Sequence, residues 1–377
     1  MSRGALGLVL SGGGARGAFH IGVHECLLGD RRFHRGPAIL SGTSSGAINA
    51  ALIAAGKNPE EMMAFWCGLA EDPPVAASEA FVRGALGALA RQAGQESLDW
   101  VTSTRPLQAA LRGVRRNLPP SATSVFSLAL EYLLIERFDL VSGFLESLPA
   151  AAVVDAGRLR ERLIEVFGGT RVPAGRHRLA VSAVDVRSGD VVRFVNARTP
   201  RTKPPEYQVV DAITVDMLLA SASIPVLFPP VEVHGRLLWD GGLLVNTPLA
   251  PVVALGADRI IPVLVNEPAG DGPITHLGEA IERALETLLE NAYNIDRKLL
   301  LERNRSRGRG YRRVTLMKPL RPATAAAFTA GSYLHFERDA LGAIRAAGRR
   351  AACDWLELAD LEDRLGGEAG NGARVLP

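Results

Sequence analysis

The sequence predicts an α/β fold with a mostly parallel central sheet, and two strand–turn–helix units near the N-terminus are the reason. The first unit is the apolar run Leu6–Leu10, which passes through a glycine-rich turn into a helical segment beginning at Ala18. The second is the apolar run Ala38–Leu40, which is followed by the turn Gly42–Gly46 and a segment rich in helix formers. Parallel strands joined by a crossover helix place both turns at the same edge of the sheet.

The length and composition fit a large globular chain. It has 377 residues, of which 47% are hydrophobic and 22% charged, enough for one large α/β domain or a domain with a cap. The net charge of +3 argues against a nucleic-acid-binding protein. The three cysteines, Cys26, Cys67 and Cys353, are far apart in sequence. They predict neither a disulfide framework nor a zinc site, and they suit a reducing compartment.

Two stretches superficially resemble export or membrane segments. The N-terminal apolar run is short and leads into glycines rather than a cleavage site, so we interpret it as the first buried strand. The longest stretch without charge, Gly36–Gly56, contains a proline, several glycines and the second turn, which argues against a transmembrane helix. We therefore expect a cytoplasmic protein, with transient peripheral contact at a membrane surface.

Ser44 is the predicted nucleophile. It stands at the apex of Gly42-Thr43-Ser44-Ser45-Gly46, with glycine two residues to each side. A nucleophile elbow needs this spacing, because a Cβ at Gly42 or Gly46 would collide with the neighbouring strand or helix. We expect the turn to hold the Ser44 hydroxyl clear of the sheet, at the positive end of the following helix.

The first turn reads Ser11-Gly12-Gly13-Gly14-Ala15-Arg16-Gly17. Its glycines also fit a dinucleotide fingerprint, but that site needs an acidic residue where the second strand ends, and the strand ends at Ser41 and Gly42 instead. We interpret the turn as an oxyanion hole whose donors are the backbone N–H groups of Gly13 and Gly14. A strand-to-helix turn that binds nothing is the plain alternative. Arg16 either steers an anionic head group or pairs with a surface carboxylate.

Asp240 is the predicted proton acceptor. A short hairpin of Val231–Val233 and Arg236–Trp239 delivers it to a strand end, where Gly241 and Gly242 permit a tight turn. A carboxylate hydrogen-bonded to the Ser44 hydroxyl can act directly as general base. The alternative is an aspartate that only shapes the turn.

Other polar features carry weaker hypotheses. His20 and His24 share one helix face, but no third ligand is nearby, so ordinary packing is favoured over a metal site. Six arginines lie between Arg303 and Arg313. Such a run is usually a solvated loop, although it can also attract an anionic lipid surface.

The predicted domain organisation has three parts. A catalytic domain spans residues 1–325 and contains a helical insertion at about 62–150, and a helical extension follows at 326–377. Within the insertion, Ala80–Ala93, Pro106–Arg116 and Ser124–Leu148 have helical apolar spacing. The insertion is either a helical layer packed on the sheet or a cap whose apolar face receives acyl chains.

Three segments together resemble the patatin-like phospholipase family: Ser11–Gly17, Gly42–Gly46 and Asp240–Gly242 occur in that family's order and spacing. Ala220–Pro225, Phe228–Pro230 and Asn246–Pro248 are similar to bacterial members. The resemblance covers about residues 5 to 265. One departure is Ser11, where many plant members carry aspartate, which weakens any inference of a plant-like substrate range.

The resemblance implies a three-layer α/β/α fold and a Ser-Asp dyad hydrolase without a catalytic histidine. Ser44 matches the nucleophile, Asp240 the proton acceptor, and Gly12–Gly17 the oxyanion-hole loop. The implied substrates are acyl esters of lipids, and the implied chemistry needs no metal or other cofactor.

Two rival functions remain. The first is an esterase with a Ser-Asp-His triad, in which His276 or His335 follows Asp240 in chain order. The position of the glycine loop on the first strand argues against it, because the triad fold takes an oxyanion donor from the loop after its third strand. The second rival is a catalytically inactive lipid-binding module.

Overall fold

The structure is a computed structural model that describes residues 4–71, 152, 154–266, 274–275, 277–306, 313–322 and 336–366. The chain divides into two compact units. One comprises Met1–Pro74, Ala156–Pro225 and Pro229–Pro377, and the other Val75–Asp155 with Val226–Phe228. All that follows concerns the first unit.

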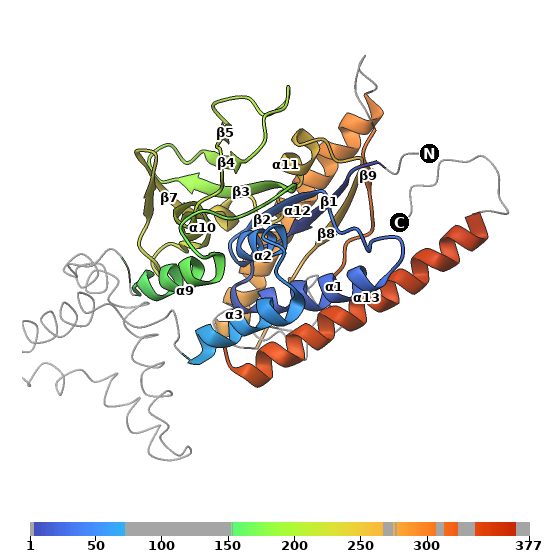
Figure 1. Cartoon of the computed structure of the whole chain (residues 1–377), viewed down its shortest axis with the longest axis horizontal. Helices are drawn as coiled ribbons and strands as arrows, with labels where there is room; N and C mark the ends of the chain where they lie inside the picture. Colours follow the sequence, from blue (N-terminus) through green and yellow to red (C-terminus); the bar gives the residue numbers. More distant parts are fainter. Residues whose placement is uncertain are drawn as a thin grey trace, which may run out of the picture. The chain divides into compact units, whose positions relative to one another are not determined.

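The described part of the chain contains one mixed, mostly parallel sheet (Figure 1). Its strands are β1 Leu6–Leu10, β2 Ile39–Thr43, β3 Arg178–Asp185, β4 Val191–Val195, β5 Tyr207–Val209, β6 Val231–Val233, β7 Arg236–Asp240, β8 Arg259–Val263 and β9 Thr315–Leu316. The order is β5-β4-β3-β2-β1-β8-β9, with the β6–β7 hairpin joined to β3. β1 is parallel to both of its neighbours, β2 and β8, as expected for strands linked by crossover helices.

Helices cover both faces of this sheet. Alternate residues of β1 enter different cores: Leu8 and Leu10 belong to one apolar cluster and Val9 to the other. The helices that contribute to the first cluster are α1 Ala18–Gly29, α2 Ser45–Ala54, α3 Pro59–Glu71, α9 Gly157–Phe167, α10 Val215–Ala222 and α13 Arg338–Gly366. Those of the second are α11 Leu249–Ala254 and α12 Leu277–Arg305. The predicted α/β/α layering is therefore confirmed.

The strand pairing of β3 positions the functional end of the sheet. The first residues of β3 pair with β2, and this ladder ends where Thr43 faces Ser182. The next residue, Ala183, faces Asp240 at the end of β7. Because β4 occupies the other edge of β3 over these residues, β2 and β7 share one edge and their C-terminal ends meet. Residues 44 and 240 are thus neighbours in space.

Most elements follow the pattern in the sequence, and the differences lie at their ends. β2 was expected to end at Ser41 and Gly42 but continues to Thr43, which also pairs with β3. The α10 helix begins at Val215, where the Thr214 side chain accepts a hydrogen bond from the Met217 N–H and caps it. Ser/Thr caps of this kind set helix starts locally.

Several predictions fall on residues outside the described part. The helical segments expected at Ala80–Ala93, Pro106–Arg116 and Ser124–Leu148 lie there, so the cap remains a prediction, as do the domain limits. Among the described helices, none is both long and apolar enough to cross a membrane.

Candidate active site

Ser44 occupies a strained turn between β2 and α2. Its backbone has φ 55° and ψ −129°, a left-handed conformation that is costly for a residue with a Cβ and that concentrates at functional sites. A Cβ on Gly42 would lie 2.3 Å from the Gly46 carbonyl carbon, and one on Gly46 would lie 2.2 Å from the Leu10 carbonyl oxygen. The expectation that both positions require glycine is confirmed.

Ser221 holds the backbone of this turn. The N–H of Ser44 donates a hydrogen bond of 3.0 Å to the Ser221 hydroxyl, and that hydroxyl donates one of 2.6 Å to the Ser182 carbonyl. All three residues are buried. The α10 helix and β3 are thereby tied to the nucleophile position. The sequence analysis includes Ser221 only as part of the family-like segment Ala220–Pro225 and predicts no role for it.

Asp240 lies against Ser44 at the meeting point of β7 and β2. Its carboxylate accepts a 2.6 Å hydrogen bond from the Gly242 N–H, and its side chain is hydrogen-bonded to the Ser44 hydroxyl. A Cβ on Gly241 would lie 2.4 Å from the Ser182 carbonyl oxygen, so glycine there allows the strand to turn tightly against β3. The structure brings the two predicted residues together.

Burial sets the protonation of this carboxyl group. Asp240 is 5% exposed. Desolvation raises its pKa to about 7, opposed by the hydrogen bonds from Gly242 and Ser44, which lower the pKa. A base with a pKa near the working pH is the most effective in general acid–base catalysis. The environment of Asp240 suits that role.

The glycine-rich loop borders Ser44 on its other side. A Cβ on Gly12 would lie 3.1 Å from the Ser44 Cβ and 2.5 Å from the Asn246 side-chain oxygen. The Gly12 N–H donates to the Asn246 carbonyl, and the Arg16 N–H to the Gly13 carbonyl. Within the described part of the chain, the N–H groups of Gly13 and Gly14 have no such partner, and they are the two donors predicted from the sequence.

The contacts of the remaining loop residues, Ala15–Gly17, hold the loop in place. Arg16 is fully buried and forms a 3.0 Å ion pair with Glu286 of α12. Of the two alternatives for Arg16, the structure favours carboxylate pairing. The Gly17 carbonyl accepts a 2.8 Å hydrogen bond from the Asn49 amide, which fixes the loop to α2.

The histidines of α1 are packing residues. His20 contacts the Asn49 amide through Nδ1 at 3.2 Å, and burial lowers its pKa to about 3. His24 is also buried, and this burial together with nearby His177 lowers its pKa to about 4. Among the described residues, no cluster of His, Cys, Asp and Glu could hold a metal ion. The rival triad candidates, His276 and His335, lie outside the described residues.

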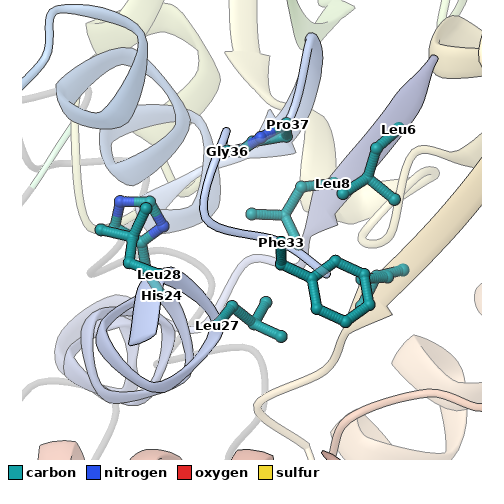
Figure 2. A pocket seen from close by; sticks show the side chains of 9 residues that line it. Leu6, Leu8, His24, Leu27, Leu28, Phe33, Gly36 and Pro37 are labelled. Atoms are coloured by element: carbon teal, nitrogen blue, oxygen red, sulfur yellow. The ribbon is translucent and has the colours of Figure 1, made fainter. Parts of the chain in front are cut away.

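One small apolar cavity lies at the opposite end of β1. It has a volume of about 10 Å³ and is lined by the start of that strand and the C-terminal half of α1, including Leu6, His24 and Leu27. Figure 2 shows Leu27 and Phe33 at its wall. Neither Ser44 nor Asp240 lines it.

This chain matches a protein-family model and is similar to several known proteins. A model described as patatin-like phospholipase matches residues 8–253. An uncharacterized NTE family protein of Mycobacterium tuberculosis is 31% identical over 247 residues, which are 65% of this chain and 27% of that protein. A cGAMP-activated phospholipase of Pseudomonas aeruginosa is 35% identical over 95 residues, 25% of this chain and 27% of the relative. The chain thus spans under a third of the length of these curated relatives.

Two solved structures are similar at low sequence identity. VipD from Legionella pneumophila has a TM-score of 0.42 at 17% identity, with coverage of 94% of this chain and 67% of that one. The type III effector ExoU has a TM-score of 0.38 at 18% identity, with coverage of 95% and 54%.

Proposed function

The chain belongs to the patatin-like phospholipase family, and we propose on this premise that it is a serine lipid acyl hydrolase. The proposed reaction is cleavage of a carboxylic ester bond in a phospholipid, lysophospholipid or neutral lipid. One observation carries the proposal: the Ser44 hydroxyl is hydrogen-bonded to a buried carboxyl group at the meeting point of two strand ends.

The proposed mechanism has two half-reactions. Asp240 accepts the Ser44 proton while the Ser44 oxygen attacks the ester carbonyl, and the N–H groups of Gly13 and Gly14 stabilise the tetrahedral oxyanion. The alcohol departs with the proton that Asp240 accepted, and the acyl group remains bound to Ser44. Asp240 then activates a water molecule that hydrolyses this acyl-enzyme. Each oxyanion donor is expected to contribute about 3 kcal/mol of transition-state stabilisation.

The strained turn supports the first half-reaction. Ser44 is held at φ 55° by contacts that glycine alone permits at positions 42 and 46, so the hydroxyl does not have to be ordered during the reaction. Such preorganisation lowers the entropic cost of reaching the transition state.

A test of the assignment compares Ser44→Ala and Asp240→Asn with the wild type on a short-chain nitrophenyl ester and a lipid panel. We expect both variants to lose turnover by at least about 10³-fold. A fluorophosphonate probe should label the wild type at Ser44 and leave Ser44→Ala unlabelled. Full activity in Ser44→Ala would disprove the assignment, and a wild type that resists the probe would favour the inactive lipid-binding module.

The rival triad is tested separately by His276→Ala and His335→Ala. The dyad predicts that both variants keep activity within a few-fold of wild type. A loss in either as deep as in Ser44→Ala would favour the Ser-Asp-His triad.

Contact with a membrane surface is the second part of the proposal. Four side chains of α12, Leu285, Leu288, Ile295 and Leu299, are 48–66% exposed, and their spacing places them along one side of the helix. The arginine-rich run begins at the end of the same helix. An apolar stripe beside basic residues is typical of helices that lie in a lipid interface.

A further inference from the structure

Two of the three cysteines, remote in sequence, meet in the fold. Cys26 of α1 and Cys353 of α13 form a side-chain hydrogen bond with each other. Both are half-buried, so a small oxidant can reach them, whereas Cys67 of α3 is buried. Cys–x–x–Cys spacing is the usual sequence signal for a dithiol pair, and it is absent here.

The two helices that carry these cysteines pack closely against each other. α1 and α13 lie side by side (Figure 1). A Cβ on Gly22 would lie 1.9 Å from the Arg345 carbonyl oxygen, and one on Gly348 would lie 2.1 Å from that of Phe19. Glycine at these two positions therefore allows the two backbones to approach closely. A disulfide requires Cα atoms about 4.4–6.8 Å apart, and Cys26 lies one helical turn beyond Gly22 on the same side.

We propose that Cys26 and Cys353 are a modification site at which a reversible disulfide ties the C-terminal helix α13 to α1. The oxidant is a hydroperoxide. The Cys353 thiol loses its proton as its sulfur attacks one peroxide oxygen; the O–O bond breaks and the departing oxygen takes up that proton, so a sulfenic acid and water (or an alcohol) result. The Cys26 sulfur then displaces hydroxide from that sulfenic acid, and its proton leaves with the hydroxide as water. Two thiols are oxidised by two electrons and one peroxide is reduced.

The order of reaction follows from the burial of Cys26 and from its hydrogen bond to Cys353. Burial, together with the hydrogen bond to Cys353, raises the pKa of Cys26 to about 12, so Cys26 is protonated in the reduced protein. Cys353 is therefore the attacking sulfur and Cys26 the resolving one.

The disulfide would act on a specific part of the fold. α13 lies beyond the family-matched residues 8–253, and α1 begins directly after the glycine loop at Gly14–Gly17. A covalent link between these helices restrains the unfolded chain across more than three hundred residues, which stabilises the folded state. The proposal does not depend on the proposed hydrolase activity.

The test treats the full chain with hydrogen peroxide, alkylates it under denaturing conditions and measures intact mass. The variants are Cys26→Ser and Cys353→Ser, with Cys67→Ser as the matched control. Reduced wild type should accept three alkyl groups and oxidised wild type one. A tryptic digest should contain a peptide pair that joins α1 to α13 and that dithiothreitol separates. The oxidised wild type should melt about 5 °C higher than the reduced form.

The three cysteine variants show which thiols form the link. Cys67→Ser should still form the linked pair and show the rise in melting temperature, and Cys26→Ser and Cys353→Ser should show neither. Three alkylated thiols after oxidation, a link that involves Cys67, or only dimers between chains would overturn the proposal. If the linked pair forms without a rise in melting temperature, the disulfide does not stabilise the packing of α13 on α1, and that part of the proposal is wrong. Matching melting temperatures of all reduced forms establish that the variants fold.

Discussion

At the scale of single residues, the site depends on a few polar contacts in a buried setting. Ser44 and Asp240 are 6% and 5% exposed, so the hydrogen bond between them forms away from bulk water and is correspondingly strong. Ser221 connects the Ser44 N–H to β3, and Asn246 accepts from the Gly12 N–H through its carbonyl. These two residues position the predicted nucleophile and the glycine loop.

The first prediction concerns pH. The proposed base must be unprotonated, and burial raises the pKa of Asp240 to about 7. The ratio kcat/KM on a soluble ester should therefore be constant above pH 7 and fall about tenfold per unit below it. Because a histidine would give a similar profile, the measurement is repeated with His276→Ala and His335→Ala. Loss of the acidic limb in either variant would count against Asp240.

The second prediction tests whether Ser221, near the end of α10, positions Ser44 or only stabilises the fold. Ser221→Ala removes the acceptor of the Ser44 N–H, so kcat should fall about tenfold with KM nearly unchanged. Ser223→Ala is the matched control, since this equally buried hydroxyl donates only to the Leu219 carbonyl. Fluorophosphonate labelling should slow in Ser221→Ala alone. Equal effects of the two substitutions would refute a positioning role for Ser221.

At the scale of elements, two contacts join the C-terminal region to the glycine loop and its helix. On one face, Glu286 of α12 pairs with buried Arg16 of the loop. On the other, α13 packs along α1, and Trp355 of α13 contacts Phe33 at a ring separation of 6.0 Å. The elements beyond the family-matched region thus support the part of the fold that carries the site.

The third prediction tests this helix packing with two glycines of α13. Gly348→Ala should lower the free energy of unfolding by about 2 kcal/mol, because its Cβ would lie 2.1 Å from the Phe19 carbonyl oxygen. Gly342→Ala meets nothing within 4 Å and should be neutral or stabilising by up to about 1 kcal/mol. Urea denaturation measures both. The same loss in both variants would contradict the close contact of α1 with α13.

At the scale of the whole molecule, the sheet separates two apolar cores, and in the part of the chain that the structure describes the stripe on α12 is exposed. Leu288 is 66% exposed and Leu299 61%. Large exposed side chains that form a continuous line mark an interaction surface more often than isolated ones do. For a family that acts on lipids, a lipid surface is the partner that we propose.

The fourth prediction is made with vesicles that contain anionic lipid. Leu288→Ser with Leu299→Ser should reduce cosedimentation at least tenfold, because each leucine that enters the lipid contributes about 1.5–3 kcal/mol. Turnover of a soluble ester should not change. Leu358→Ser on α13, where the leucine is 52% exposed, is the control and should bind like wild type. Unchanged binding of the double variant would exclude this stripe as the membrane contact.

Features that depend on neighbours along the chain could be predicted before the fold was known. The first strand, the elbow with its two obligatory glycines, and the hairpin that ends in Asp240 all follow from apolar runs broken by glycine, because local sterics restrict such turns to few residue types. These patterns also identified Gly13 and Gly14 as the candidate donors.

The contacts between residues remote in sequence could not be predicted in this way, because they arise from the folded arrangement of strands and helices. β2 and β7 share one edge of β3, and this pairing brings Asp240 to Ser44. The roles of Ser221 and Glu286, and the contact of Cys26 with Cys353, also depend on this folded arrangement. A hydroxyl, carboxylate or thiol carries no local signal for its distant partner, because the partner is selected by strand register and by the close approach of helices.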